Sequence, residues 1–417
     1  MRTMPRDTAL ESSLALLSDP YGFVGKRCRR YRSDVFRARI MLRDTICMAG
    51  PAAAELFYDP KRFMRCGAAP EPLRATLFGK HGVQTLDGEE HRHRKRMFMS
   101  LMTPDRIAEL GRLTREQWAI NARMGSRKPD LVLYQEVQQI LTRAVCAWAG
   151  VPLPEADVTR RRKQLVALFD KAGAVGFGHV RSRIARKQAE RWIGGLVEQV
   201  RSDSLRPRDD TALRVIALHR QLDGSLLPTH VAAVEVLNVL RPTVANAVFI
   251  VFAAHALHRH PECAARINSA EKGFAELFIQ EVRRYYPFFP AVIARAHHDF
   301  EWEGYRFRQG QRVMLSLHDT NHDPRAWEAP EQFRPERFRG WNRSPYNFVP
   351  QGGGDHWVNH RCPGEAITGE VMKVAVEFLA CRLAFEVPEQ RLDIDCSRLP
   401  ALPRDGFIIR NVRLMAP

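Results

Sequence analysis

The chain has 417 residues, 45% of them apolar, so it can bury a substantial core as one large domain or as several smaller ones. Its formal net charge of +17 suits an anionic partner, but no zinc-finger, RNA-binding or arginine-tail motif accompanies that charge. We interpret the charge as a solvated basic surface and expect no nucleic acid partner. The eight cysteines form no C-x-x-C pair, which argues against a disulfide framework or a zinc site and favours a reducing, cytoplasmic setting.

The amino-terminal part is predicted to combine a short helix with a small sheet. Residues 10–17 have a helical apolar pattern, and the alternation over residues 35–42 is typical of strands. A charged helix is predicted after Gly88, and it places His91 and Lys95, four residues apart, on one face. Helical patterns then dominate to about residue 280.

No segment is predicted to cross a membrane. The amino terminus lacks a sustained apolar run, and the longest apolar stretch, 244–257, is too short to span a bilayer. A polar break at 202–211 is interpreted as a surface loop, because helical periodicity resumes on both sides of it. We therefore expect a single domain over residues 1–417, without stable membrane insertion.

Residues 229–260 are apolar on nearly all sides, which predicts a long, buried central helix. Arg241 and Pro242 lie in its middle. Proline removes a helical hydrogen bond, so a kink is expected there, and a buried guanidinium requires an anion. Either Glu235 or Glu281 supplies that anion, or a ligand carboxylate binds the arginine bidentately beside the kink. No acidic residue followed by threonine occurs in the rest of this helix.

From residue 288 onward, short alternating runs separated by turns indicate small sheets. They are AVIARA at 291–296, FEWEGYRF at 300–307 and RVMLSL at 312–317. The chain is expected to end in a hairpin around residues 407–415. Because helical patterns fill most of the preceding chain, the fold class is predicted to be mainly α with small β-sheets.

The most distinctive stretch is FVPQGGGDHWVNHRCPGEA, residues 348–366. Cys362 is followed by Pro363, and apolar residues then recur at spacings of four, three and four, which predicts a helix with proline in its first turn. The helix terminus and the neighbouring His360 and Arg361 are expected to favour the thiolate, which prepares the sulfur as a metal ligand or nucleophile. The alternative is a buried structural cysteine beside a glycine-rich turn.

Three charged residues complete a larger pattern. Glu281 and Arg284 lie three apart on one helical face, and FRPERF at 333–338 supplies Arg337. In the order E-x-x-R, P-E-R-F and F…C-x-G, these motifs resemble the cytochrome P450 superfamily of haem-thiolate enzymes, over the whole chain. The resemblance implies the cytochrome P450 fold, a structural ion-pair triad of Glu281, Arg284 and Arg337, and haem b whose iron is bound by the Cys362 thiolate.

The same resemblance implies binding sites for the haem propionates. His91 and Lys95 occupy the position of the family's H-x-x-x-R pair. Arg65 and His360 are further candidates. Solvated charge on a helix face is the alternative role for these side chains.

Departures from the ordinary family pattern indicate one branch of the superfamily. The central helix reads RPTVANAV where an acid–alcohol pair is usual, and the segment from residue 348 to residue 362 is longer than the usual loop. With LRPTVA, HGVQTLDG and RCPGE, these features resemble bacterial fatty-acid peroxygenases, which use hydrogen peroxide and need no obligatory reductase. Trp357 and Asn359 stand where Tyr and Gly are expected in that branch, so packing at the haem edge is expected to differ.

That branch implies a role for Arg241 as a catalytic residue, beside Pro242. A long-chain fatty acid pairs its carboxylate with the arginine, and the carboxylate then serves as the acid–base group in cleavage of the peroxide bond. Because the head group is held beside the iron, hydroxylation is expected chiefly at C2, with some at C3. Gln84 is expected in the same pocket, and Phe78 and Phe289 as channel walls. An amide at Gln84 exchanges no protons, so hydroxylation should exceed decarboxylation.

Two other functions stay open on the sequence. A reductase-dependent haem-thiolate monooxygenase turns over with NAD(P)H and redox partners, and hardly with peroxide. A non-catalytic haem sensor or carrier keeps its iron ligated on both faces and shows no spectral shift with substrate.

Overall fold

The structure, a computed structural model, describes residues 2–125, 129–170 and 176–415. Its α-helices are α1 (Ser13–Ser18), α2 (Phe23–Tyr31), α3 (Pro51–Phe57), α4 (Glu71–Leu73), α5 (Gly88–Ser100), α6 (Pro104–Gly125), α7 (Leu133–Ala149), α8 (Val158–Ala167), α9 (Phe177–Arg201), α10 (Ala212–Ala217), α11 (Thr229–Ala245), α12 (Ala247–Arg259), α13 (Pro261–Asn268), α14 (Phe274–Tyr285), α15 (Leu317–Asn321) and α16 (Glu365–Glu377). The first helix begins three residues later than expected.

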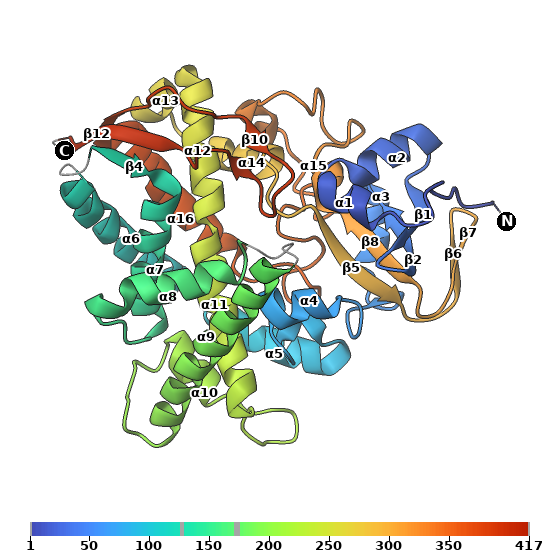
Figure 1. Cartoon of the computed structure of the whole chain (residues 1–417), viewed down its shortest axis with the longest axis horizontal. Helices are drawn as coiled ribbons and strands as arrows, with labels where there is room; N and C mark the ends of the chain where they lie inside the picture. The colour runs from blue at the N-terminus through green and yellow to red at the C-terminus, as the bar shows by residue number, and fades with distance from the viewer. Residues whose placement is uncertain (1, 126–128, 171–175, 416–417) are drawn as a thin grey trace.

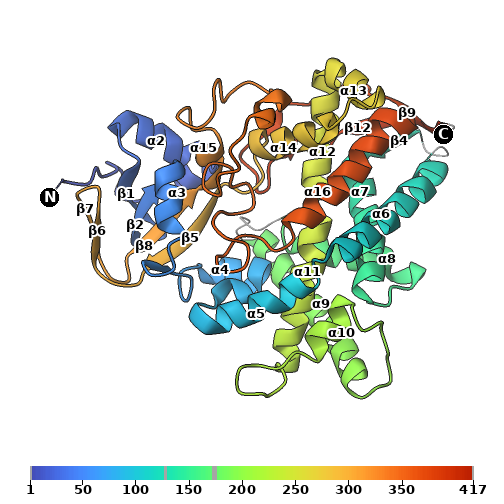
Figure 2. The same cartoon turned by 180° about the vertical axis from the view of Figure 1, so that it is seen from behind.

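The strands are β1 (Val35–Ile40), β2 (Arg43–Met48), β3 (Phe63–Met64), β4 (Asp130–Val132), β5 (Ala291–Ala296), β6 (Phe300–Trp302), β7 (Tyr305–Phe307), β8 (Arg312–Ser316), β9 (Leu383–Glu386), β10 (Ile394–Asp395), β11 (Leu402–Pro403) and β12 (Ile408–Leu414). Helices fill the larger part of the molecule, and the main sheet lies at the end that carries the amino terminus (Figure 1). Seen from behind, α16 runs beside α6 (Figure 2). The predicted mainly α class with small sheets is confirmed.

The main sheet has the strand order β1-β2-β8-β5-β3. β2 and β8 are parallel, and the other neighbours are antiparallel. In this register Ile46 lies beside Val313, and both belong to the apolar cluster under the sheet. The strands predicted at 291–296, 300–307 and 312–317 are therefore present.

The prediction of a hairpin at the carboxyl terminus is wrong. β12 is the middle strand of a three-stranded sheet and pairs antiparallel with β4 on one side and β9 on the other. Its partner β4 lies far away in the chain. A local alternating pattern shows that a strand is present but not which strands flank it.

The predicted central helix is present, but its interruption lies elsewhere than expected. α11 continues past Pro242, and Asn246 separates it from α12. The Asn246 N–H donates to the carbonyl oxygen of Thr243 at 3.2 Å, which tightens this turn. The stretch Thr229–Arg259 is long and apolar enough to cross a membrane, but 94% of its most apolar window is buried inside the protein, so it is a core helix.

The charged triad joins α14 to the segment that follows the main sheet. Arg284 Nε lies 2.7 Å from Glu281 Oε2, and Arg337 Nε lies 3.1 Å from Glu281 Oε1. The side chains of Glu281 and Arg284 are fully buried. Arg284 also donates to the carbonyl oxygen of Asn321 at 3.0 Å, so one carboxylate and two guanidinium groups tie three segments together.

Replacing Glu281 by alanine should destabilise the protein strongly. The change leaves Arg284 buried without its carboxylate, which costs about 3–5 kcal/mol. Urea unfolding measures the loss. Glu271→Ala is the matched control, because this carboxylate pairs with Arg266 and Arg339 at the surface, where ion pairs contribute little to stability. Equal effects of the two substitutions would contradict a structural role for the triad.

Candidate active site

One cavity between the cysteine loop and α11 brings the predicted site residues together. Its lining includes all ten of them: Arg65, Phe78, Gln84, His91, Lys95, Arg241, Pro242, Phe289, His360 and Cys362. Apolar side chains such as Leu73, Phe169 and Leu399 supply much of the remaining wall. Cys362 and Arg241, which lie far apart in the sequence, therefore face a common space.

Cys362 lies just before α16, whose N-cap is Gly364. Its backbone N–H donates to the carbonyl oxygen of Gln351 at 3.0 Å, and the Gln351 side-chain nitrogen lies 3.8 Å from Cys362 Sγ. Burial raises the pKa of the thiol, and Glu365 acts in the same direction. Burial therefore opposes the thiolate that the helix terminus is expected to favour, while the Gly364 N–H, Lys95 and Arg283 act in the opposite direction and lower the pKa of the thiol. A bound cation would stabilise the anionic sulfur.

The two basic neighbours of the cysteine are engaged in other ways. Burial lowers the pKa of His360 to about 4, so this imidazole is neutral near pH 7. Arg361 Nε lies 2.8 Å from Glu365 Oε2. Burial raises the pKa of Glu365, but Arg283, His356 and Arg361 outweigh this effect and hold that pKa well below its usual value. This network fixes the shape of the loop that carries the cysteine.

Four basic side chains lie together along one part of the cavity wall: Arg65, His91, Lys95 and His360. The rings of His91 and His360 stack with their centroids 3.9 Å apart. Burial lowers the pKa of His91 to about 3 and that of Lys95 to about 8, and Lys95 Nζ donates to backbone carbonyl oxygens. Within the described part of the chain, the one carboxylate that pairs with these four side chains belongs to Asp87, whose Oδ1 lies 3.7 Å from His360 Nε2. Burial disfavours the protonated forms of these side chains, and few protein carboxylates lie beside them to offset that cost. The propionate carboxylates of a haem would supply the missing negative charge.

Arg241 lies on α11 and is 6% exposed. Among the described residues its guanidinium makes one hydrogen bond, from Nη2 to Asn238 Oδ1 at 3.4 Å, and its Nε has no partner. Burial lowers the pKa of Arg241 to about 9. Neither internal carboxylate considered above is its partner, since Glu235 pairs with Arg94 and Glu281 belongs to the triad. The cavity thus contains a guanidinium that an anionic ligand can neutralise.

Sequence reasoning missed the residues that hold Arg241 in place. Asn238 Nδ2 donates to Glu235 Oε2 at 2.9 Å and to Gln84 Oε1 at 3.3 Å. Glu235 Oε1 accepts the Val83 N–H at 2.9 Å. The buried Glu235 carboxylate therefore positions both polar side chains of the pocket. It holds the backbone beside Gln84 through the Val83 N–H, and it orients Arg241 through Asn238. The spacing E-x-x-N-x-x-R in α11 places these three side chains on one helical face and could have revealed them.

The two unusual residues of the cysteine loop do not line the cavity. Trp357 is 55% exposed. Asn359 Nδ2 donates to the carbonyl oxygen of Tyr58 at 2.7 Å, and its Oδ1 accepts the Asp355 N–H at 2.7 Å. Asn359 therefore fastens the loop to the end of α3, and the expected change in packing at the haem edge stays a prediction.

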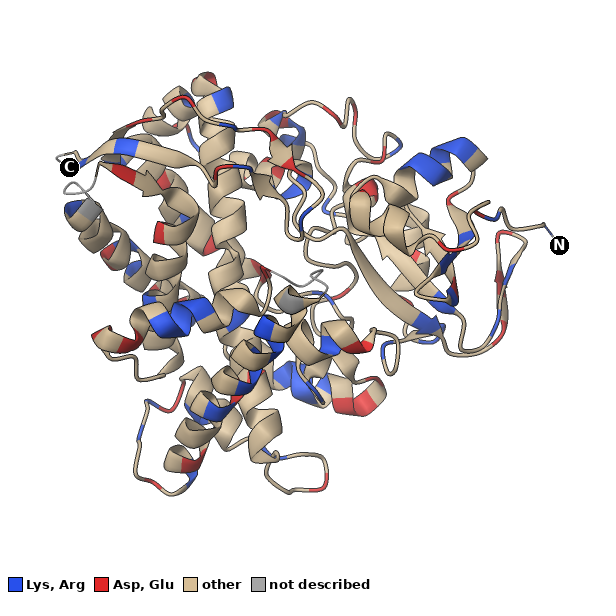
Figure 3. Cartoon of the chain, viewed as in Figure 1, with Lys and Arg blue, Asp and Glu red and all other residues tan. Residues whose placement is uncertain are grey.

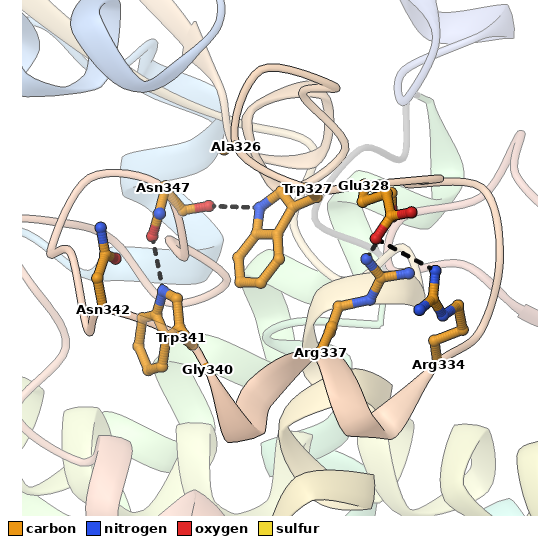
Figure 4. Close-up of a pocket in the computed structure, with 9 residues that line it drawn as sticks. All are labelled: Ala326, Trp327, Glu328, Arg334, Arg337, Gly340, Trp341, Asn342 and Asn347. Carbon is orange, nitrogen blue, oxygen red and sulfur yellow. Dashed lines mark hydrogen bonds and ion pairs between the residues drawn. The ribbon is translucent and has the colours of Figure 1, made fainter.

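A second, open depression lies beside the triad (Figure 4). Trp327 Nε1 donates to the carbonyl oxygen of Asn347 at 3.0 Å, and Trp341 Nε1 donates to Asn347 Oδ1 at 2.9 Å. Arg334 and Arg337 both face Glu328. Because these polar groups satisfy one another, the depression belongs to the structural frame around the triad.

Comparisons with known proteins agree with this geometry. The family model "Cytochrome P450" matches residues 273–409. The R241E variant of cytochrome P450SP alpha (CYP152B1) is 49% identical, with a TM-score of 0.96 over 98% of this chain and 100% of that one. Cytochrome P450EX alpha (CYP152N1) with myristic acid is 43% identical, and a variant of cytochrome P450 OleT with arachidonic acid is 33% identical. Each has a TM-score of 0.97 over 100% of both chains. Identity of this extent over whole chains places the protein in the cytochrome P450 family, among relatives of the CYP152 enzymes.

Proposed function

We propose that the protein is a haem-thiolate fatty-acid peroxygenase that uses hydrogen peroxide to hydroxylate long-chain fatty acids at C2 and, to a smaller extent, at C3. The observation that carries this proposal is Arg241, a buried guanidinium that no described carboxylate neutralises, facing a largely apolar cavity. Relatives bind carboxylic acids, namely myristic acid, arachidonic acid and (R)-ibuprophen.

The residues around the cavity fit haem b. Cys362 would bind the iron through its sulfur, and Arg65, His91, Lys95 and His360 would bind the propionates. When bound, haem supplies the oxidising chemistry that hydrogen peroxide drives. The chain contributes a sulfur held in position, because the loop that carries it is fixed by Gln351 and Glu365.

The chain itself offers no acid–base pair on the α11 side. No carboxylate belongs to the described residues that line the cavity. The Thr243 hydroxyl donates to the carbonyl oxygen of Val239 at 2.9 Å, inside α11, and is therefore occupied. The substrate carboxylate held by Arg241 can fill this role by taking a proton and returning it.

Anchoring the head group also selects the carbon that reacts. When the carboxylate of the fatty acid pairs with Arg241, C2 and C3 are the alkyl carbons held closest to the anchored head group. Phe78 and Phe289 narrow the space around the rest of the alkyl chain. The Gln84 amide exchanges no protons, so hydroxylation should exceed decarboxylation. Because the substrate itself supplies the proton-transfer group, we infer that the enzyme needs no obligatory reductase. We also infer that it is cytoplasmic.

Cys362→Ser should abolish thiolate ligation. The expected result is loss of the red-shifted absorption band that a thiolate-bound haem shows when reduced under carbon monoxide. Absorption spectra of the purified native and substituted proteins measure it. Cys146→Ser, at a buried cysteine that is not among the residues lining the cavity, is the matched control and should leave the band in place. A band that persists in Cys362→Ser would show that another residue binds the iron.

Arg241→Ala should abolish fatty-acid oxidation while haem binding and fold persist. Loss of the buried charge pair with substrate corresponds to about 3–5 kcal/mol, or more than a hundredfold in rate if it is expressed in the transition state. Mass spectrometry of products from a saturated long-chain acid and peroxide measures the effect. Arg241→Lys keeps the charge and should retain part of the activity.

The same native protein should oxidise guaiacol, which has no carboxyl group, only when a short carboxylic acid is added. If the acid makes no difference, the carboxylate does not act as the acid–base group. If NAD(P)H with redox partners supports turnover and peroxide does not, the enzyme is a reductase-dependent monooxygenase.

Asn238→Asp should weaken fatty-acid binding by about tenfold or more, because the introduced carboxylate lies where Oδ1 now faces Arg241 and competes with the substrate. Asn238→Leu removes the hydrogen bond without adding charge and should reduce affinity less. Calorimetric titration of both variants with the same fatty acid compares them. The explanation fails if the neutral substitution weakens binding as much as the acidic one.

A further inference from the structure

The turn between β1 and β2 has an unusual sequence for its backbone conformation. Met41 and Leu42 both have positive φ, 50° and 58°, and Ile40 pairs with Arg43 across the turn. Two-residue hairpin turns of this kind normally contain Asn-Gly or Asp-Gly, because bulky side chains strain the left-handed conformation. Yet both side chains here are apolar and exposed, Leu42 by 73%. A strained turn that exposes apolar side chains points to a role in binding another molecule rather than in stabilising the fold.

The residues before and within α1 hold this turn in place. The Met41 N–H donates to the Ser13 hydroxyl at 2.7 Å, and the Leu42 N–H donates to Glu11 Oε2 at 3.0 Å. These bonds set the turn beside the segment that carries Leu10, which precedes α1, and Leu14 and Leu17, which lie on α1. We call the combined surface the apolar ridge, and its residues are Leu10, Leu14, Leu17, Met41 and Leu42. Leu10 is 90% exposed and Leu14 80%, so the ridge projects into solvent rather than lining a groove.

The charge around the ridge is basic. Arg39 and Arg43 flank the turn, are exposed, and have no ion-pair partner among the described residues. Three acidic groups lie nearby: the Glu11 carboxylate accepts the N–H groups of the turn, Asp44 pairs with Arg37, and Asp19 pairs with Lys26 at 2.6 Å. Figure 3 shows further basic residues on the adjacent α2. An apolar tip between two free arginines has the composition of a segment that lies at a lipid interface.

We propose that the apolar ridge docks the protein on the surface of an anionic phospholipid bilayer. Its projecting leucines enter the boundary of the acyl chains, and Arg39 and Arg43 contact the head groups. A protein partner fits less well, because side chains exposed by 80–90% offer no shaped surface to match. The net charge of +17 favours the same anionic surface over longer range.

This location also connects the bilayer with the cavity. The inner side of α1, at Ala15 and Leu16, packs against a cluster of buried apolar residues that includes Phe36. Ala291 and Ile293 of β5 pack against the same cluster and line the cavity. In a docked protein, α1 and this cluster therefore lie between the lipid and the cavity wall. That link rests on the proposed function, whereas the docking itself is measured without any turnover.

The experiment is cosedimentation of the full-length holoprotein with phosphatidylcholine vesicles that contain or lack phosphatidylglycerol. The native protein should bind the anionic vesicles and lose affinity as salt is raised. The combined variant Leu10→Ser, Leu14→Ser and Leu42→Ser should bind about tenfold more weakly. The matched control is Ile120→Ser with Met124→Ser, two exposed apolar residues of α6, which should bind as the native protein does.

Three results would overturn the proposal. They are vesicle binding that the triple substitution leaves unchanged, binding that does not depend on phosphatidylglycerol, and self-association of the native protein that the triple substitution abolishes. The last would show that a second copy of the chain covers the ridge. Because peroxide-driven oxidation of a soluble fatty acid should be equal in native and triple-substituted protein, failure of docking is distinguishable from failure of the proposed function.

Discussion

Pairing of buried arginines with carboxylates is the interaction on which this structure depends. The pairs are Arg94 with Glu235, Arg186 with Glu190, Arg283 with Glu365, and Arg284 with Glu281. Two of them join elements that lie far apart in the chain, and the other two lie within a single helix. Removal of the carboxylate leaves an uncompensated charge in the core. Arg241 is equally buried and, among the described residues, departs from this pattern at the cavity, because it has no carboxylate partner and only one long hydrogen bond. In the same part of the chain Arg312 also lacks a carboxylate partner, but it donates to Thr45 and to the carbonyl oxygen of Ile40 instead. The candidate active site therefore lies where a buried charge has no carboxylate partner among the residues that the structure describes.

A neutral residue makes that exception possible. Glu235 lies on the same helical face as Arg241 and could neutralise it, but Asn238 stands between them and Arg94 binds the carboxylate instead. An amide orients the guanidinium through its oxygen without cancelling the charge, whereas a carboxylate at the same place would compete with the ligand. The long 3.4 Å bond to Asn238 also leaves Arg241 free to bind more strongly to a ligand.

Short motifs made most of the site predictable from the sequence. Most of the ten predicted residues that line the cavity belong to a local pattern, such as the cysteine loop or the helical spacing of His91 and Lys95. What sequence reasoning missed depends on contacts between distant segments. Neither the pairing of Glu235 with Arg94 nor the position of β12 between β4 and β9 leaves a periodic trace. The raised pKa of Cys362 was missed for a related reason, since desolvation depends on what covers the sulfur.

The interruption of the central helix shows how such a distant contact overrides a local rule. Proline predicts a break at Pro242, yet the helix continues there and ends at Asn246, whose Oδ1 accepts the Thr368 hydroxyl of α16 at 2.9 Å. Thr368 in turn accepts the Gln351 side-chain amide at 2.9 Å, the same amide that approaches Cys362 Sγ. The break therefore belongs to a chain of hydrogen bonds that runs from α11 to the cysteine. Because these bonds fix Cys362 relative to the helix that carries Arg241, the sulfur and the guanidinium are held in register across the cavity.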